Sequence, residues 1–253
     1  MAQQLMIANW KMNKTHDQAK DYMDILAQER LPSQVEVVIC PPFTALGAVA
    51  AGAKASLSMV GAQNCSWAAS GALTGEISPE MLVALTVKYV LVGHSERRSL
   101  FGESDDIVAR KVQLLLQSAL IPVLCLGETE QERDGNLTEE VLRRQLDAAL
   151  PLTSDEASKI VIAYEPVWAI GTSRTANGEQ VTAAMQLIRH YLATKYTAAT
   201  AEAIPILYGG SVNLGNIASL AECPIDGALV GGASLNPQDF ANLTRSFAVA
   251  KEL

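Results

Sequence analysis

Eight short apolar runs alternate with segments of helical spacing along the whole chain, and this alternation constrains the fold more than any other feature. The runs are rich in β-branched residues and end at Gly, Pro or polar residues, as expected for strands buried on both faces. They comprise residues 5–8, 35–40, 58–62, 89–93, 122–126, 160–164, 206–208 and 227–230. The clearest helical stripe contains Val181, Ala184, Met185, Ile188, Tyr191 and Leu192.

Repeated strand–helix units with short connections predict a parallel sheet, and eight of them predict a closed (β/α)8 barrel. A chain of 253 residues suits this architecture, so we expect residues 1–253 to form a single barrel domain. The alternative is an open doubly wound sheet. The Gly-x-Gly-x-x-Gly turn typical of that fold does not follow the first run, which favours the barrel.

Composition and charge narrow the range of functions. A formal net charge of −8 argues against nucleic acid as a partner and requires a locally positive site for any anionic substrate. No apolar run is long enough to span a membrane and no signal-like segment opens the chain, so we expect a cytoplasmic protein. The four cysteines and three histidines show no metal-binding spacing, and we expect buried, reduced thiols and no metal.

Polar residues and glycines directly follow most of the predicted strands. In a barrel these positions converge on one mouth, the face that carries chemistry. They are Asn9 and Lys11; Gln63 and Asn64; His94, Ser95 and Glu96; Glu165; Gly209, Gly210 and Ser211; and Gly231 and Gly232. Side chains far apart in the sequence are therefore expected to meet in one small volume.

Glu165 ends the sixth run and precedes Pro166, which cannot continue a strand. Residues 167–176 then form a loop in which Trp168 and Ile170 would be exposed to water, a composition typical of a lid that closes over an acid–base group. A lone glutamate at a strand end more often forms a structural ion pair. The convergence of other polar groups on the same mouth favours a catalytic base instead.

Two glycine pairs follow the last two strands, where barrels commonly bind phosphate. Backbone N–H groups at Gly209, Gly210, Gly231 and Gly232 can approach phosphate oxygens, and Ser211 adds a hydroxyl. A helix expected to begin near Gly232 would direct its positive end toward the phosphate. One glycine pair alone would indicate an ordinary turn, but two pairs after consecutive strands indicate a phosphate site.

His94 and Lys11 complete the expected site. If Ser95 caps a short helix after the fourth run, the positive end of that helix lowers the pKa of His94 and keeps the imidazole neutral. A neutral imidazole can donate a hydrogen bond to a carbonyl oxygen. Lys11 follows the first run and places an ammonium group at the mouth. Considered alone, His94 could equally be a buried structural histidine, and Lys11 could be an ordinary surface lysine.

A base, a neutral electrophile, a cation, a phosphate cradle and a lid together define a reaction class. They predict proton abstraction next to a carbonyl in a small phosphorylated substrate, which gives an enediolate. No cofactor is needed if the same proton returns to the neighbouring carbon. The lid would keep water away from an intermediate that otherwise eliminates phosphate.

These motifs resemble the triosephosphate isomerase family, and the resemblance covers the whole chain. Its most specific segments are Gly93-His94-Ser95-Glu96-Arg97-Arg98, residues 163–172 around Glu165, and Tyr208-Gly209-Gly210-Ser211-Val212-Asn213. The resemblance implies a cofactor-independent isomerase that interconverts dihydroxyacetone phosphate and D-glyceraldehyde 3-phosphate, a step of glycolysis and gluconeogenesis.

Carried over by position, the resemblance gives each matching residue an expected role. The catalytic residues are Glu165 as the base, His94 as the electrophile, and Asn9 and Lys11 as the pair that binds substrate oxygens. The phosphate-binding residues, together with Asn9 and Lys11, are Gly171, Ser211, Gly231 and Gly232. Ser95 and Glu96 are expected to support the reacting groups from behind.

The family typically forms a homodimer through the loop after the third strand, which here runs from Asn64 to Glu76. This connection is long and carries Trp67 and Leu73, which a monomer would expose. The lid departs from the family pattern, because its end usually reads Gly-Lys and here reads Ser173-Arg174. This departure changes the expected hinge energetics of the lid and leaves the chemistry unchanged.

Two other interpretations remain open. A different barrel enzyme acting on a phosphosugar would keep the glycines but have another base, histidine and lid. A non-catalytic phosphate-binding protein could share the fold, because fold alone does not define function. Such a protein is expected to have lost Lys11, His94 or Glu165, and all three are present.

Overall fold

The computed structural model describes residues 2–150, 153–170 and 175–252. Eight parallel strands close into a barrel in sequence order, with β8 paired to β1. The strands are β1 (Gln4–Asn9), β2 (Val35–Cys40), β3 (Met59–Ala62), β4 (Val87–Val92), β5 (Ile121–Leu126), β6 (Val161–Tyr164), β7 (Ile206–Tyr208) and β8 (Gly227–Val230). The predicted (β/α)8 barrel is confirmed, and the alternative of an open sheet is wrong.

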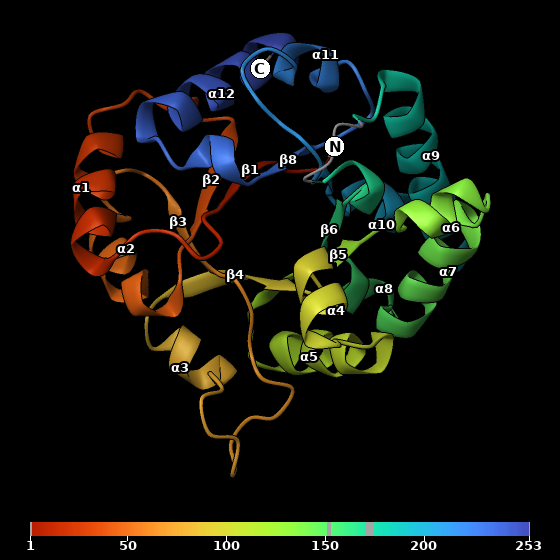
Figure 1. Cartoon of the computed structure of the whole chain (residues 1–253), viewed down its shortest axis with the longest axis horizontal. Coiled ribbons are helices and arrows are strands. Elements are labelled where there is room, and N and C mark those ends of the chain that lie inside the picture. Colours follow the sequence, from red (N-terminus) through yellow and green to blue (C-terminus); the bar gives the residue numbers. More distant parts are fainter. Residues whose placement is uncertain (1, 151–152, 171–174, 253) are drawn as a thin grey trace.

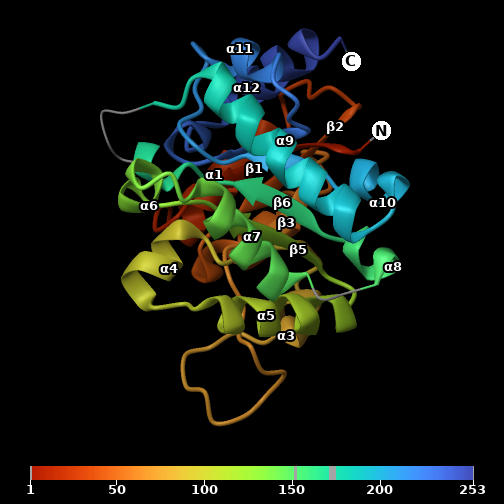
Figure 2. The same cartoon turned by 90° about the vertical axis from the view of Figure 1, so that its right-hand side faces the viewer.

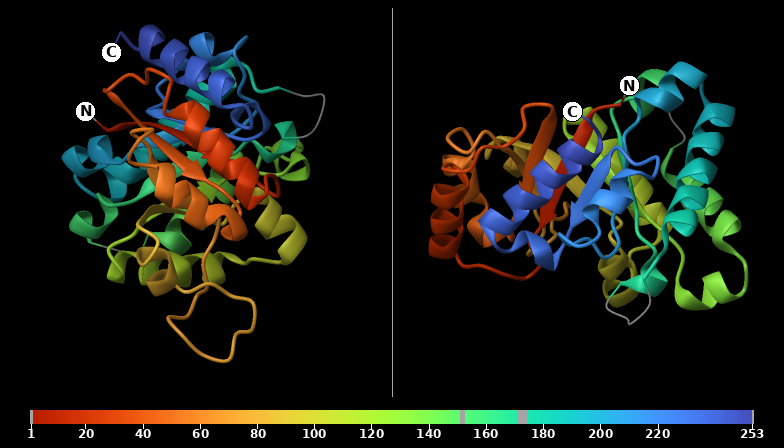
Figure 3. Two further views of the ribbon diagram at one scale, coloured as in Figure 1. Left: turned by 90° about the vertical axis from the view of Figure 1, so that its left-hand side faces the viewer. Right: turned by 90° about the horizontal axis from the view of Figure 1, so that it is seen from above.

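Helices surround the barrel on its outer face, as the view in Figure 1 shows, and α1 and α12 lie side by side (Figure 3). The α-helices are α1 (His16–Leu26), α2 (Leu46–Gly52), α3 (Pro79–Val83), α4 (Ser95–Phe101), α5 (Asp105–Gln117), α6 (Glu130–Asp134), α7 (Thr138–Ala149), α8 (Ser154–Ala157), α9 (Gly178–Lys195), α10 (Ala198–Ala203), α11 (Ile217–Ala221) and α12 (Pro237–Ala250). Short 3₁₀ turns are η1 (Phe43–Ala45), η2 (Val167–Ala169) and η3 (Gly232–Ser234). Within the described ranges, no helix is both long and apolar enough to cross a bilayer.

Two apolar cores hold the strands in place. Alternate strand residues point into the barrel and fill it; they are Leu5, Ile7, Val38, Cys40, Tyr89, Leu91, Val123, Cys125, Val161, Ala163, Leu207 and Leu229. The intervening strand residues pack against the helices in a second, larger core. Burial on both faces explains why the strands form nearly continuous apolar runs in the sequence. All four cysteines are buried and unpaired, as expected.

The connection between β3 and α3 projects away from the barrel (Figures 1 and 2). Its neck is closed by the Ser66 N–H, which donates to the Ile77 carbonyl at 2.8 Å. Trp67 is 39% exposed, as predicted. Leu73 is partly exposed, and its N–H donates to the Gly71 carbonyl at 2.9 Å in a local turn. The loop therefore exposes Trp67 and part of Leu73 to water.

Candidate active site

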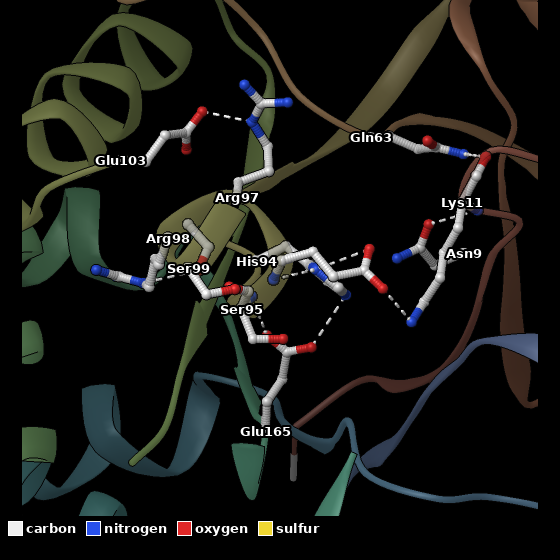
Figure 4. Close-up of polar contacts among 12 residues, drawn as sticks. Asn9, Lys11, Gln63, His94, Ser95, Arg97, Arg98, Ser99, Glu103 and Glu165 are labelled. Carbon is white, nitrogen blue, oxygen red and sulfur yellow. Dashed lines mark hydrogen bonds and ion pairs between the residues drawn. The ribbon is translucent and has the colours of Figure 1, made fainter. Parts of the chain in front are cut away.

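A cavity of about 380 Å³ lies at the carboxyl ends of the strands and brings together most of the residues predicted to converge there; Gln63 and Asn64 do not line it. Its polar and glycine lining includes Asn9, Lys11, His94, Glu165, Gly209, Gly210, Ser211, Gly231 and Gly232. Ser95 and Glu96 contact this set from behind, as Figure 4 shows for Ser95. Gly171, Ser173 and Arg174 lie outside the described residues.

Glu165 follows β6 directly and its side chain is only 2% exposed. One carboxylate oxygen, Oε2, accepts the Ser95 N–H at 2.9 Å, and Oε1 lies 3.1 Å from His94 Nε2 (Figure 4). Burial raises the pKa of Glu165 above its ordinary value, and the His94 and Ser95 donors offset only part of that effect. A buried carboxylate with a raised pKa is a stronger base once it is ionised.

His94 is itself the N-cap of α4, so the expectation that Ser95 caps this helix is wrong. The His94 Nδ1 accepts the Glu96 N–H at 3.2 Å, and Ser95 is instead the first helical residue. A ring nitrogen that accepts an N–H carries no proton, so the proton of a neutral His94 is on Nε2. The Nε2–H faces the cavity and Glu165, where it can donate to a substrate oxygen.

Lys11 is held in a left-handed backbone conformation, with φ of 52°. Such a conformation costs a non-glycine residue about 1–3 kcal/mol and must be enforced by its surroundings. The Lys11 N–H donates to Asn9 Oδ1 at 3.0 Å, and Gln63 Nε2 donates to the Lys11 carbonyl at 2.9 Å. Its Nζ donates to Glu96 Oε1 at 2.7 Å. Gln63 thus has a positioning role that its place after the third strand did not specify.

The opposite wall of the cavity is backbone from the turns after β7 and β8. A Cβ added to Gly232 would meet no protein atom within 4 Å, so its backbone is open to the cavity. A Cβ on Gly231 would lie 3.4 Å from Lys11 Cε, which places the lysine beside this turn. The helix expected near Gly232 is instead the 3₁₀ turn η3, and α12 begins only at Pro237. The turn is fixed by Ser234 Oγ, which donates to the Gly231 carbonyl at 2.7 Å.

Comparison with known proteins agrees with this geometry. The family model described as triosephosphate isomerase matches residues 4–247. The chain belongs to the triosephosphate isomerase family. It is 48% identical over 250 residues to the protein named triosephosphate isomerase from Symbiobacterium thermophilum, covering 98% of each chain. It is 50% identical over 246 residues to the protein of that name from Acidithiobacillus ferrooxidans, covering 96% of this chain and 95% of that one.

Within this family fold, the segment after β5 contributes a residue with no role expected from the sequence. Glu128 is fully buried and accepts the Trp168 Nε1–H at 2.9 Å and the Tyr164 hydroxyl at 3.1 Å. Trp168 is consequently only 3% exposed, which corrects the expectation that it faces water. Arg133 lies 5.1 Å above its ring. Glu128 is the second residue after β5, and this position could have identified it.

No group of three His, Cys, Asp or Glu side chains suited to a metal ion occurs in the part of the chain that the structure describes. The groups that line the cavity include hydrogen-bond donors and one carboxylate. Lys11, the His94 Nε2–H and the backbone of two glycine-rich turns face one buried carboxylate across it. This arrangement suits an anionic substrate that carries both a carbonyl and a phosphate.

Proposed function

We propose that the chain interconverts dihydroxyacetone phosphate and D-glyceraldehyde 3-phosphate through an enediolate. The observation that carries this proposal is that the Glu165 carboxylate and the His94 Nε2–H lie 3.1 Å apart in one cavity, opposite two glycine-rich turns. Relatives named triosephosphate isomerase support the choice of substrate. A cytoplasmic location, where glycolysis takes place, follows from it.

In the proposed reaction, Glu165 is the base and His94 the electrophile. The carboxylate takes a proton from the carbon beside the carbonyl, and the C–H electron pair forms the carbon–carbon double bond of the enediolate. The His94 Nε2–H stabilises the oxygen that becomes negative. Glu165 then returns the proton to the neighbouring carbon, while the hydroxyl proton moves, by way of His94 Nε2, from the oxygen that becomes the new carbonyl to the oxygen that becomes the new hydroxyl. Atoms and electrons therefore balance without a cofactor. For this the carboxylate must leave the Ser95 N–H and reach the substrate.

Substrate binding is proposed for the remaining groups of the cavity. Asn9 and Lys11 would bind the carbonyl and hydroxyl oxygens, and the Lys11 ammonium supplies the local positive charge that an acidic protein needs. The N–H groups near Gly231 and Gly232 and the Ser211 hydroxyl would bind the phosphate. We keep the predicted phosphate-binding role of Gly171 as a proposal. We also keep as a proposal that Ser173 alters the hinge of the lid.

The proposed activity predicts turnover of D-glyceraldehyde 3-phosphate by the purified protein in a coupled assay that detects dihydroxyacetone phosphate. We expect turnover in buffer that contains a chelator and no nucleotide. Pentose and hexose phosphates serve as controls, because a different phosphosugar enzyme would turn over one of them instead. Binding of phosphate without any turnover would favour the non-catalytic interpretation and contradict the proposal.

We also propose that two copies of the chain associate through the loop from Asn64 to Glu76. The loop projects from the barrel (Figure 2) and is anchored at its base, where Lys111 Nζ donates to Asn64 Oδ1 at 2.7 Å and to Glu103 Oε1 at 2.5 Å. Large apolar side chains are exposed after each of the strands β1 to β4; they are Met12, Phe43, Trp67, Leu100 and Phe101. One sector of the barrel rim therefore presents apolar surface, as an interface requires.

The proposed interface predicts that Thr74→Asp, at an exposed position of the loop, separates the subunits. A charge buried without a partner should weaken association by about a hundredfold. The sedimentation coefficient and the specific activity of the variant should fall together on dilution. The reason is that the loop is expected to dock beside the Asn9–Lys11 and His94–Glu96 segments of the partner. Ala51→Asp, an exposed position on α2, is the matched control. A Thr74→Asp monomer with full activity would contradict the coupling of assembly to catalysis.

A further inference from the structure

Gln145 is a polar residue on the apolar face of α7. The buried residues of this helix are Val141, Leu142, Gln145, Leu146 and Ala149, and Gln145 is 4% exposed. A buried amide costs free energy unless its donors and acceptor are hydrogen-bonded. The bonds that Gln145 makes therefore explain why a glutamine occupies this position.

The amide of Gln145 forms a two-way pair with the backbone of Gly127, the residue after β5. The Gly127 N–H donates to Gln145 Oε1 at 2.9 Å, and Gln145 Nε2 donates to the Gly127 carbonyl at 3.3 Å. The pairing of β5 with β6 ends just before this point, at Leu126 and Tyr164. Both backbone groups of Gly127 are buried, and Gln145 supplies the partners that a neighbouring strand would otherwise supply.

Gly127 lies directly against the backbone of the proposed base. An added Cβ at Gly127 would lie 1.7 Å from the Glu165 carbonyl oxygen and 2.7 Å from its carbon. The Glu165 N–H also donates to the Leu126 carbonyl at 2.8 Å. Any shift of the peptide at residue 127 must therefore move the backbone that carries the carboxylate.

We infer that Gln145 is a positioning residue for Glu165, acting from outside the barrel through the backbone of Gly127. The inference rests on the proposed isomerase activity and adds a residue to it. Gln145 does not line the substrate cavity; it lines a second cavity of about 380 Å³, whose other walls include Ser95, Gly127 and Val167. Its effect on the reaction passes through the position of the carboxylate, not through contact with substrate.

The first test is Gln145→Met, which keeps the side-chain length and removes both hydrogen bonds. We expect kcat per folded molecule to fall about tenfold, because a small displacement of the base is costly in the transition state. KM and the inhibition constant of inorganic phosphate should stay close to the parent values, since the phosphate turns follow β7 and β8. Gln113→Met, an exposed glutamine on the neighbouring helix α5, is the control and should behave like the parent.

The second test is Gln145→Glu, which makes the pair with Gly127 depend on pH. A protonated carboxyl can accept from the Gly127 N–H and donate to its carbonyl, whereas a carboxylate repels that carbonyl. Burial raises the pKa of the introduced carboxyl. The charged groups around the adjoining cavity do not reverse this rise in pKa; they are Arg98, Glu103, Asp105, Glu132 and Arg144. The nearby Glu128 and Glu165 add negative charge. The ratio of variant to parent kcat should therefore rise as the pH falls from about 9 to about 6.

The outcomes separate a positioning role from a structural one. A purely structural residue would lower the melting temperature and leave kcat per folded molecule unchanged, which would overturn the inference. A ratio of Gln145→Glu kcat to parent kcat that does not change with pH would also overturn the inference. This second experiment is the decisive test if Gln145→Met folds poorly. If the parent protein shows no turnover, the proposed activity itself is refuted. If the parent is active and both Gln145 variants have the same kcat as the parent, only the role of Gln145 is refuted.

Discussion

Glu165→Asp should lower kcat by about a hundredfold while KM changes little. The substitution keeps the charge but draws the carboxylate back by about 1 Å, so the reacting carbon lies beyond its best reach. The phosphate turns after β7 and β8 are untouched, and they are expected to supply most of the ground-state binding. Steady-state kinetics in both directions of the reaction measures the effect. An unchanged kcat would remove Glu165 from the mechanism.

The pH dependence of kcat/KM gives an independent check on the same residue. The base must be ionised in the free enzyme, so activity is lost as the pH falls through the pKa of Glu165. Burial raises that pKa, which places the acid limb above the range of an ordinary glutamate. A limb at or below the ordinary value would mean that another group acts as the base.

The same shift means that Glu165 lowers the stability of the protein at the pH where it works. A carboxyl with a raised folded-state pKa makes a contribution to stability that is fully present below its unfolded-state pKa and is lost as the pH rises through the folded-state value. Lys11 adds a second cost through its left-handed backbone. Both costs fall on residues that line the cavity, where strain and desolvation are expected.

The sequence allowed the barrel to be predicted because its strands are buried on both faces. The runs 35–40, 206–208 and 227–230 coincide with β2, β7 and β8. The predicted run 89–93 begins two residues after the start of β4, because Lys88 interrupts the apolar pattern. In the structure, Lys88 Nζ donates to Glu36 Oε1 at 3.0 Å, so a charged residue is accommodated within a strand.

The site was predictable where its residues directly follow strands, because the barrel brings those positions together. Asn9, Lys11, His94 and Glu165 all line one cavity for this reason. The local conformation of the site was harder to predict from the sequence. The cap of α4 depends on the ring orientation of His94, and the turn at Gly232 depends on bonds made by Ser234.

Helix residues that support the site or the projecting loop from outside could not be placed from strand positions. Gln145 and Lys111 are buried polar residues on helices whose sequence pattern shows only an apolar stripe. Which backbone or side chain each one meets depends on how the helix packs on the barrel. A polar residue within an apolar stripe does indicate a buried partner, but it does not identify that partner.

Gly127→Ala is expected to lower kcat by at least about a hundredfold and to destabilise the folded protein by about 1–3 kcal/mol. The added methyl group would lie 1.7 Å from the Glu165 carbonyl oxygen, far inside van der Waals contact. Backbone cannot move aside as a flexible side chain can, so β5 and β6 must separate at their ends. This displaces the carboxylate, breaks the pair with Gln145, and disturbs Glu128 beneath Trp168.

Thermal melts and kcat per folded molecule measure the two effects of Gly127→Ala separately. Gly47→Ala on α2 is the matched control, because a Cβ there meets nothing within 4 Å and alanine favours helix by about 1 kcal/mol. Binding of inorganic phosphate should be retained by both variants, since the turns near Gly231 lie across the cavity. A folded Gly127→Ala protein with parental kcat would show that the base tolerates movement of its backbone. That result would also remove the physical basis for a positioning role of Gln145, because both arguments depend on the contact between Gly127 and Glu165.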